Sequence, residues 1–281
     1  MSDELETHRA YLHGVAYRML GSVAEADDVV QDAFLRWQRV ERGAVENPRA
    51  YLAQVVTRLC LDRLKSARAR REEYVGAWLP EPIVEDAAGA ADIAHDVSVA
   101  LLLTLERLSP LERAAFLLRD VFDLDYAAIA GTLERSEEAV RQLAARAREH
   151  VRAERPRFAP SPEAEARLGG AFGAALATGN IDALMTLLAE DAVLYSDGGG
   201  KRRAALNPIV GRDRIVRFFR GLHRRFGLPP IEAVRPARIN GTVGFVILVD
   251  GVHETVALEL SGDQVAAIYI VRNPDKLRHV S

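Results

Sequence analysis

Residues 125–152 read DYAAIAGTLERSEEAVRQLAARAREHVR, and their spacing predicts two helices joined by a tight turn. The first helix spans residues 125–133, Glu134 and Arg135 form the turn, and Ser136 caps the second helix. The second helix has an apolar face opposite its arginines, made of Val140, Leu143, Ala144, Ala147 and Val151. A DNA recognition helix needs this division, because one face packs on partner helices while the other meets bases and phosphates. An ordinary surface helix with solvated arginines is the alternative interpretation.

The composition of the whole chain limits its class. It has 281 residues, 49% hydrophobic and 27% charged, which is typical of a folded protein of two or three domains. With 40 acidic and 37 basic residues the net charge is −3, which excludes a uniformly basic nucleic-acid coat. The single cysteine, Cys60, excludes an internal disulfide and a multi-cysteine zinc site. We expect it to be a small buried side chain, and we expect no metal and no cofactor.

The sequence shows no sign of export or membrane insertion. The N-terminus, MSDELE, is acidic and lacks the basic region of a signal peptide. No apolar run approaches the roughly 18 residues that a membrane span needs. These features predict a cytoplasmic protein with no membrane partner.

Charge is strongly segregated in the first hundred residues. Residues 47–71 hold seven basic side chains and one acidic side chain, a net charge of +6. Residues 72–96 hold seven acidic side chains and no lysine or arginine, a net charge of −7. This pattern predicts a phosphate-binding helix followed by an acidic linker that shields it, and a solvated charged helix face is the alternative.

Capping signals and periodicity divide the chain into an all-helical part and an α+β part. Ser22–Glu25 and Ser109–Glu112 have the pattern of capping boxes, and Asn47–Pro48 opens another helix. Prolines between residues 156 and 162 mark a boundary. Beyond them we predict helices over residues 163–190 and 212–226, and strands over residues 192–195, 242–250, 252–260 and 264–271.

A second helix, around residues 27–34, carries an acidic cluster. Asp27, Asp28, Gln31 and Asp32 crowd its first two turns, where the helix dipole favours acidic groups. The dipole explains part of this pattern. A surface for a partner protein is the competing explanation.

In order and spacing, these segments resemble the bacterial extracytoplasmic function (ECF) sigma factors across residues 8–155. The matching stretches are Ala16–Gly21 with Asp28–Phe34, Asn47–Leu52 with its basic helix, Leu108–Arg113, and the helix-turn-helix. The resemblance implies two all-α sigma domains, region 2 over residues 1–72 and region 4 over residues 97–158. The acidic linker, residues 73–96, joins them.

The resemblance also implies partners. Region 2 would bind the β′ clamp helices of core RNA polymerase through Asp28, Gln31, Asp32 and Phe34. It would capture the melted −10 promoter element through Asn47, Arg49, Tyr51, Arg58, Arg63, Lys65 and Arg68. Region 4 would lie on the β flap and read the −35 element through Ser136, Glu138, Arg141, Gln142, Arg146 and Arg148. The free chain is expected to be a monomer.

Residues 163–281 resemble a SnoaL-like domain, a cone-shaped α+β barrel with a pocket. Three motifs, Trp78–Pro82, Asp197–Lys201 and Asn273–Leu277, resemble signatures of the ECF subgroup with a fused SnoaL-like extension, sometimes called SigJ-like. This implies that the extension regulates the sigma factor in cis, in place of an anti-sigma protein. The implied regulatory residues are Trp78, Pro80, Glu81, Asp197, Gly199, Lys201, Asn273, Asp275 and Lys276, and Lys201 is expected to pair with the acidic linker.

Three other functions stay open from the sequence. A SnoaL-like domain can be an acid–base enzyme, for which Tyr195, Asp197, Asp250 and His253 are the candidates. Asp197, beside three glycines, suits a loop contact better than a held base, so we expect no enzymatic activity. The domain could instead sense a small-molecule ligand in its pocket. A helix-turn-helix repressor is the third alternative, but it has no use for residues 8–72.

Overall fold

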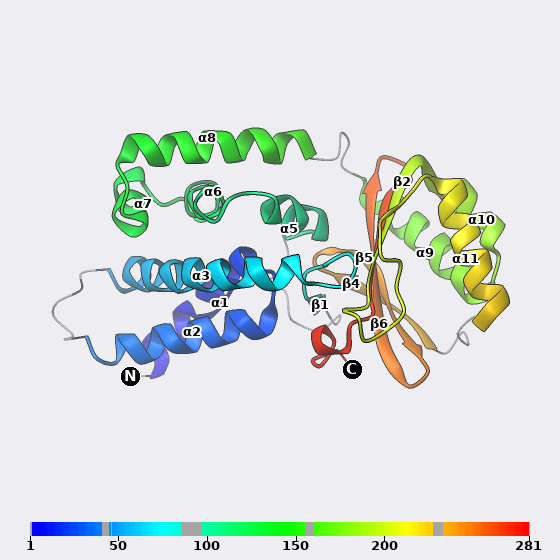
Figure 1. The fold of residues 1–281 in the computed structure, drawn as a ribbon, viewed down its shortest axis with the longest axis horizontal. Helices are drawn as coiled ribbons and strands as arrows, with labels where there is room; N and C mark the ends of the chain where they lie inside the picture. The colour runs from blue at the N-terminus through cyan, green and yellow to red at the C-terminus, as the bar shows by residue number, and fades with distance from the viewer. Residues whose placement is uncertain are drawn as a thin grey trace. The chain divides into compact units, whose positions relative to one another are not determined.

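The computed structural model describes residues 2–40, 45, 47–85, 97–154, 160–226 and 233–280. The chain forms two compact units, one made of Met1–Glu73 with Leu101–Arg155 and the other of Tyr74–Ala100 with Pro156–Ser281 (Figure 1). The Trp78–Pro82 motif of the linker therefore belongs to the same unit as the SnoaL-like residues 163–281. Within the described residues, no helix is long and apolar enough to cross a membrane.

The first unit is helical, as predicted. Its elements are α1 (Ser2–Leu20), α2 (Val23–Trp37), α3 (Pro48–Glu72), α5 (Val99–Glu106), α6 (Pro110–Phe116), a π-helical turn (Leu117–Val121), α7 (Tyr126–Leu133) and α8 (Glu137–Glu154). The boundary between the two units falls within α5, so that its residues from Leu101 onward belong to the first unit. The predicted helix starts are confirmed. Ser22 Oγ accepts a hydrogen bond from Glu25 N at 3.2 Å, and Ser109 and Glu112 form a reciprocal capping box. Cys60 is fully buried, as expected, and burial raises the pKa of its thiol.

A buried arginine ties the helices of this unit together. Arg113 is only 3% exposed, and its guanidinium donates to the carbonyls of Met19 and Leu105 at 2.5 and 2.8 Å. It also forms an ion pair with Glu106 at 3.1 Å. Burial lowers the pKa of Arg113 to about 10, which leaves the group charged at neutral pH. Since these partners lie on α1 and α5, Arg113 fixes α6 against both helices.

The second unit is a mixed sheet with helices on one face (Figure 1). Among the described residues the strand order is β1-β4-β5-β6-β7-β2-β3, in which β2 and β7 are parallel and the other neighbouring strands are antiparallel. The strands are β1 (Val84–Glu85), β2 (Leu188–Asp197), β3 (Ile209–Val210), β4 (Val234–Ile239), β5 (Thr242–Val249), β6 (Val252–Ser261) and β7 (Gln264–Val271). The helices are α9 (Pro162–Thr178), α10 (Ile181–Leu187) and α11 (Arg212–Phe226). Apolar side chains fill the space between helices and sheet, with Phe172 stacked on Phe245.

The α+β prediction is confirmed, with corrections at individual elements. The strands predicted near residues 242–250, 252–260 and 264–271 are present. The helix predicted to reach residue 190 was wrong, because α10 ends at Leu187 and β2 begins at Leu188. Leu184 and Leu188 continue the helical spacing of the core, so the apolar pattern contains no stop signal there. Strands β1, β3 and β4 were not predicted.

Candidate nucleic-acid interface and linker clamp

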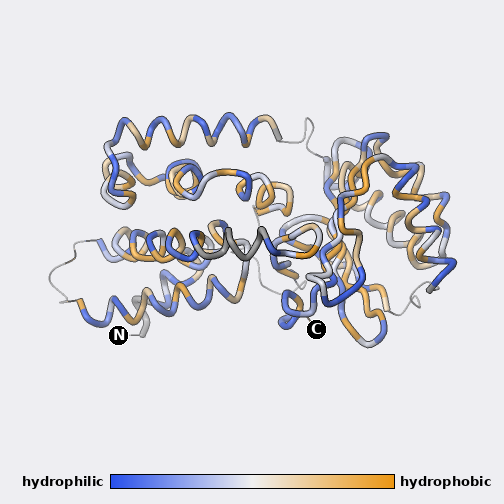
Figure 2. Tube along the Cα trace, viewed as in Figure 1, coloured by the Kyte–Doolittle hydropathy of each residue, from blue (hydrophilic) through white to orange (hydrophobic). Residues whose placement is uncertain are grey.

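The predicted helix-turn-helix is present in α7 and α8. Glu134 ends α7 in the left-handed conformation, with φ of 56°, at the position where glycine is common. Ser136 Oγ then accepts a hydrogen bond from Ala139 N at 3.2 Å and caps α8. Val140 and Ala144 are fully buried, so the apolar face of α8 packs inward as predicted. Hydrophobic and hydrophilic residues alternate along this helix (Figure 2).

The N-terminal half of α8 offers its side chains to solvent. Glu138, Arg141 and Gln142 are exposed. Arg141 forms an ion pair with Glu137 at 2.7 Å and lies 5.0 Å from the centre of the Tyr126 ring. Both contacts are at the surface, where they contribute little free energy and exchange readily for another anion. The side chains at this end of α8 are therefore accessible from solvent.

Two further arginines predicted to touch the −35 element have partners inside the unit. Arg146 pairs with Glu112 at 2.8 Å, and this contact lowers the pKa of Glu112. Arg148 pairs with Asp120 at 2.7 Å, which raises the pKa of the guanidinium. These pairs join α8 to α6 and to the π-helical turn. They orient α8, and any DNA contact by these arginines competes with them.

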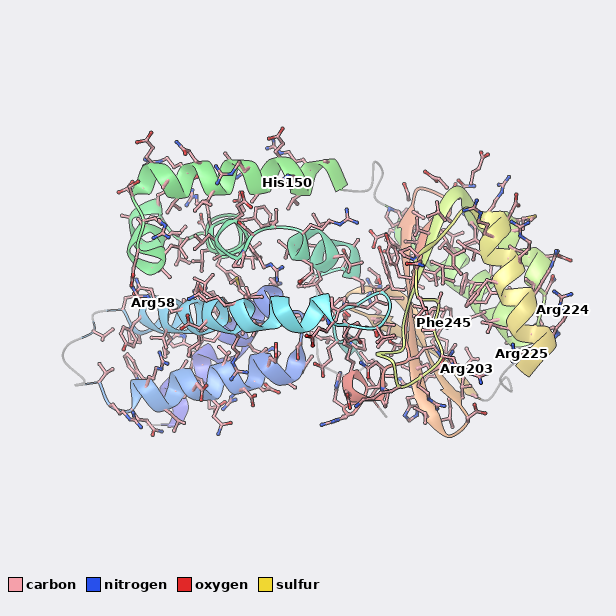
Figure 3. All side chains as sticks on the ribbon, in the orientation of Figure 1. Arg58, His150, Arg203, Arg224, Arg225 and Phe245 are labelled. Carbon is pink, nitrogen blue, oxygen red and sulfur yellow. The ribbon has the colours of Figure 1, made fainter. Side chains whose placement is uncertain are left out.

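Arg58 on α3 binds the C-terminal end of α7 (Figure 3). Its guanidinium donates to the carbonyls of Gly131 at 2.9 Å and Thr132 at 3.1 Å, and it lies 3.5 Å from Glu134. The carbonyls that end a helix carry partial negative charge, so they attract a guanidinium. A DNA phosphate that binds Arg58 therefore competes with these contacts.

Arg63 joins two sets of residues that the sequence assigned to different partners. Its guanidinium lies 3.4 Å from Asp28 and 3.5 Å from Asp32 on α2. The arginine was predicted to contact the −10 element, and the two aspartates were predicted to contact polymerase. These candidates therefore lie side by side on the α2–α3 surface, with the exposed Gln31.

The other −10 candidates lie along the first turns of α3 and further toward its end. Asn47 caps the helix through its Oδ1, 3.0 Å from the amide of residue 50. Arg49 and Tyr51 each contact an aromatic ring of α1 or α2. Lys65 pairs at 2.9 Å with an aspartate one turn earlier. The side chain of Arg68 lies outside the described residues.

Phe34 was assigned to the polymerase surface, but the structure places it in the core. It is 9% exposed, and the Arg9 guanidinium lies 5.1 Å from its ring centre. The next residue, Leu35, is 49% exposed. Leu35 stands two turns after Asp28 on the same side of α2 and was not singled out from the sequence.

The three sequence motifs of the second unit meet at the buried carboxylate of Asp197, at the end of β2. Oδ1 accepts hydrogen bonds from Tyr74 Oη at 2.6 Å and Gly199 N at 3.0 Å. Oδ2 accepts from Leu79 N at 2.8 Å and Lys276 Nζ at 2.7 Å. We call Tyr74, Leu79, Asp197, Asn273 and Lys276 the linker clamp, because they join the linker to the C-terminal motif.

Lys276 occupies an aromatic cage within the linker clamp. Its Nζ lies 4.9 Å from the Tyr74 ring centre and 4.4 Å from the Trp78 ring centre, and it also donates to the carbonyl of Leu79. Asn273 Nδ2 donates to Tyr74 Oη at 2.8 Å. Burial and the Asp197 charge raise the pKa of Tyr74, so the phenol stays a proton donor.

Gly199 allows the backbone to lie close to Asn273 and Tyr74 of the linker clamp. Its φ is 57°, and a Cβ here would lie 2.2 Å from Asn273 Nδ2 and 3.0 Å from Tyr74 Oη. Any other residue would therefore push the linker clamp apart. Gly198 is under the same constraint, because a Cβ there would lie 2.1 Å from the carbonyl oxygen of Arg202.

The ion pairs of Lys201 and Glu81 correct one prediction. Lys201 was expected to pair with an acidic residue of the linker, but it pairs with Asp275 of the C-terminal motif. Lys201 and Arg278 together lower the pKa of Asp275. The linker residue Glu81, 6% exposed, pairs instead with His279 at 3.3 Å. Pro80 is buried beside it.

The linker also adds a strand to the sheet. Val84–Glu85 pairs antiparallel with the end of β4. Ile83 N donates to Asn240 Oδ1 at 3.1 Å, and Gly241 N donates to Glu85 Oε1 at 2.7 Å. Two separate attachments, the linker clamp and β1, therefore hold the linker on the C-terminal domain.

The four candidate acid–base residues, Tyr195, Asp197, Asp250 and His253, differ in position and contacts. Tyr195 stacks on Tyr269 at 5.5 Å. Asp250 is exposed at a hairpin turn, with φ of 52°, and His253 follows it near the start of β6. Asp197 is engaged by its four donors. Among the described residues, no three His, Cys, Asp or Glu side chains gather in a way that could hold a metal ion.

Comparison with known proteins agrees with this division of the chain. Residues 5–70 match the Sigma-70 region 2 family, residues 98–151 match Sigma-70 region 4, and residues 170–276 match the SnoaL-like domain family. The chain is 39% identical to the ECF RNA polymerase sigma factor SigJ of Mycobacterium tuberculosis, over 97% of this chain and 92% of that protein. It is 36% identical to the probable ECF sigma factor SigI of the same species, over 74% and 72% of the two chains.

A solved structure extends the likeness to the fold. The crystal structure of M. tuberculosis SigJ covers 99% of this chain and 98% of its own, with a TM-score of 0.83 and 36% sequence identity. The likeness thus includes both sigma regions and the SnoaL-like extension. The chain belongs to the ECF RNA polymerase sigma factors, and it carries a C-terminal SnoaL-like domain as SigJ does.

Proposed function

We propose that this sigma factor positions core RNA polymerase on promoters through three surfaces. The exposed N-terminal half of α8 reads the −35 element as duplex DNA. The α3 side of region 2 captures the melted −10 element, and the α2 surface around Asp28, Gln31, Asp32 and Leu35 binds polymerase. The C-terminal domain acts on these surfaces in cis by holding the linker. The buried Asp197 carboxylate, which joins all three sequence motifs, is the observation that carries this regulatory role.

Arg141 is the side chain best suited to read a base in the −35 element. It is exposed near the start of α8, and its ion pair with Glu137 is a surface pair that a guanine edge or a phosphate can replace. Arg146 and Arg148 are engaged with α6 and the π-helical turn, so their main role is to orient the helix.

Replacing Arg141 with alanine is therefore expected to weaken binding to the −35 element by about 1–3 kcal/mol, or roughly 5- to 150-fold. The measurement is run-off transcription with core polymerase on the protein's own promoter region, together with the affinity for a duplex that carries the −35 element. Arg107→Ala removes an exposed arginine outside α8 and is the matched control. Equal initiation by both variants would show that α8 is not the reading helix.

Promoter binding requires region 2 and region 4 to separate from the arrangement described here. Arg58 is bound to the end of α7, and Arg63 is bound to Asp28 and Asp32. The −10 and −35 elements are separate stretches of DNA. We therefore propose that α3 cannot bind the −10 element while α8 binds the −35 element as long as Arg58 of α3 holds the end of α7. We propose that polymerase and DNA replace these contacts, with Asp28 and Asp32 turning to the polymerase.

The C-terminal domain is suited to control this change because it holds the chain between the two regions. The linker clamp fixes residues 74–79, and β1 fixes residues 83–85, so the length of linker available for separating the regions depends on both. Any signal that loosens the clamp lengthens this tether. We propose regulation through linker length and not through catalysis, because Asp197 is a saturated acceptor and apolar side chains fill the domain interior. As a sigma factor, the protein would act in the cytoplasm.

A further inference from the structure

We propose that the outer face of α11, in the SnoaL-like domain, is a third DNA-binding surface, which contacts the phosphates of duplex DNA near the promoter. The helix has six arginines and one aspartate, a net charge of +5 in 15 residues. Its apolar side is committed to the core, since Ile215 and Val216 are fully buried and Phe219 is 9% exposed. The arginines of the opposite side therefore face solvent.

The exposed arginines of α11 form a continuous surface. At 100° per residue, Arg217, Arg220 and Arg224 lie within about 60° of one another around the helix axis, and Arg214 and Arg225 lie beside them on one side. All five are exposed, and Figure 3 shows Arg224 and Arg225 projecting from the C-terminal end of the helix. The distance from Arg214 to Arg225 along the axis is about 16 Å, or roughly five base-pair steps of B-DNA.

Part of this charge is not neutralised within the described residues. Arg220 pairs with Asp182, whereas Arg214, Arg217 and Arg224 have no ion pair among the residues that the structure describes. On the recognition helix α8, by contrast, Arg141, Arg146 and Arg148 each pair with an acidic side chain. The face of α11 is thus the less compensated of the two basic surfaces.

The arrangement is unfavourable for an isolated helix. Arginines three and four residues apart repel one another, and cations in the first turn oppose the helix dipole. Gly221 lies between the arginines on the exposed side, and a Cβ there would meet nothing within 4 Å. Packing therefore does not require this glycine, and its absent side chain allows a polyanion to approach the helix closely.

The chemistry of the face selects duplex DNA over a protein. A protein interface needs an apolar core inside a polar rim, and among the side chains of α11 that the structure describes, over residues 212–225, the exposed ones include no large apolar group. Guanidinium groups bind phosphate through two parallel hydrogen bonds. Because a sigma factor is held at promoter DNA by its other domains, even a weak phosphate-binding face gains a high effective concentration of DNA.

The test is the salt dependence of duplex binding by the full chain, measured by fluorescence anisotropy with a mixed-sequence duplex of about 30 base pairs. Three substitutions, Arg214→Gln, Arg217→Gln and Arg224→Gln, are combined in one variant. If each arginine neutralises one phosphate, the slope of log affinity against log salt becomes shallower by about 2.7. The corresponding triple lysine variant keeps the slope of the unaltered chain, because it keeps the charges.

A control variant removes the same charge from exposed positions of the same domain outside α11, through Arg167→Gln, Arg235→Gln and Arg238→Gln. We expect it to bind the duplex with the slope of the unaltered chain. An unchanged slope in the α11 glutamine variant would overturn the proposal, and so would an equal change in both variants. If α11 instead holds an acidic segment of this chain or of another protein, its glutamine variant binds DNA normally. The affinity of each variant for core polymerase is measured in parallel, and it shows whether the polymerase-binding surface of region 2 is unchanged.

Discussion

Replacing Asp197 with asparagine is expected to destabilise the C-terminal unit by about 3–5 kcal/mol, because it leaves one buried charge without its partner. Lys276 is 13% exposed and its Nζ lies 2.7 Å from the carboxylate. An asparagine also presents an NH₂ group where the carboxylate accepted two hydrogen bonds. Either orientation of the amide sets that donor against the donors of Tyr74 and Gly199, or against those of Leu79 and Lys276.

Urea unfolding and hydrogen exchange measure this effect together. Urea unfolding gives the free energy of unfolding of the C-terminal unit. Hydrogen exchange of the Leu79 amide reports whether the linker has left the Asp197 carboxylate. Asp250→Asn is the matched control, since Asp250 is exposed at a hairpin turn. A loss below about 1 kcal/mol, with the Leu79 amide still protected, would mean that the linker clamp is not a principal contact.

Glu259 is the basis of the second large effect, a dependence of stability on pH. Its Oε2 is buried without a hydrogen-bond partner in the described residues, and burial raises the pKa of Glu259 to about 7. The folded state therefore prefers the protonated acid. The stability that this preference contributes is complete below about pH 4.5, and it is lost as pH rises through about 7.

Glu259→Gln is expected to raise the stability of the C-terminal unit at pH 8 by about 3 kcal/mol and to flatten its profile between pH 5 and pH 8. Urea unfolding at a series of pH values is the measurement. Glu190→Gln, at an exposed position on β2, is the control and should keep the sloping profile. Parallel profiles for Glu259→Gln and the unaltered chain would contradict this assignment of the titrating group.

Local patterns in the sequence predicted the elements that depend on neighbouring residues. The capping serines, the split faces of α8 and the three consecutive strands rest on spacing within one element, and all are present. The family resemblance likewise identified both sigma regions and the SnoaL-like domain. The assignment of Phe34 to the surface ignored such a pattern. Val30, Ala33 and Phe34 follow the spacing of the buried face, so periodicity alone would have put the ring inside.

Contacts between distant parts of the chain could not be predicted in the same way. Tyr74 and Asn273 are separated by 199 residues, and no spacing rule connects them. The acidic linker made an ion pair with Lys201 electrostatically reasonable. A short 3₁₀ turn, Pro274–Lys276, brings Asp275 to Lys201 instead. Likewise, β1 has only two residues and becomes a strand because β4 offers an edge.

We propose that the C-terminal domain sets promoter activity through its hold on the linker. The most direct measurement is run-off transcription with core polymerase, comparing the unaltered chain, Asp197→Asn and Asp250→Asn at equal polymerase occupancy. We expect Asp197→Asn to change initiation severalfold, whereas Asp250→Asn matches the unaltered chain. Equal initiation by all three proteins, with hydrogen exchange showing the linker released in Asp197→Asn, would contradict the claim.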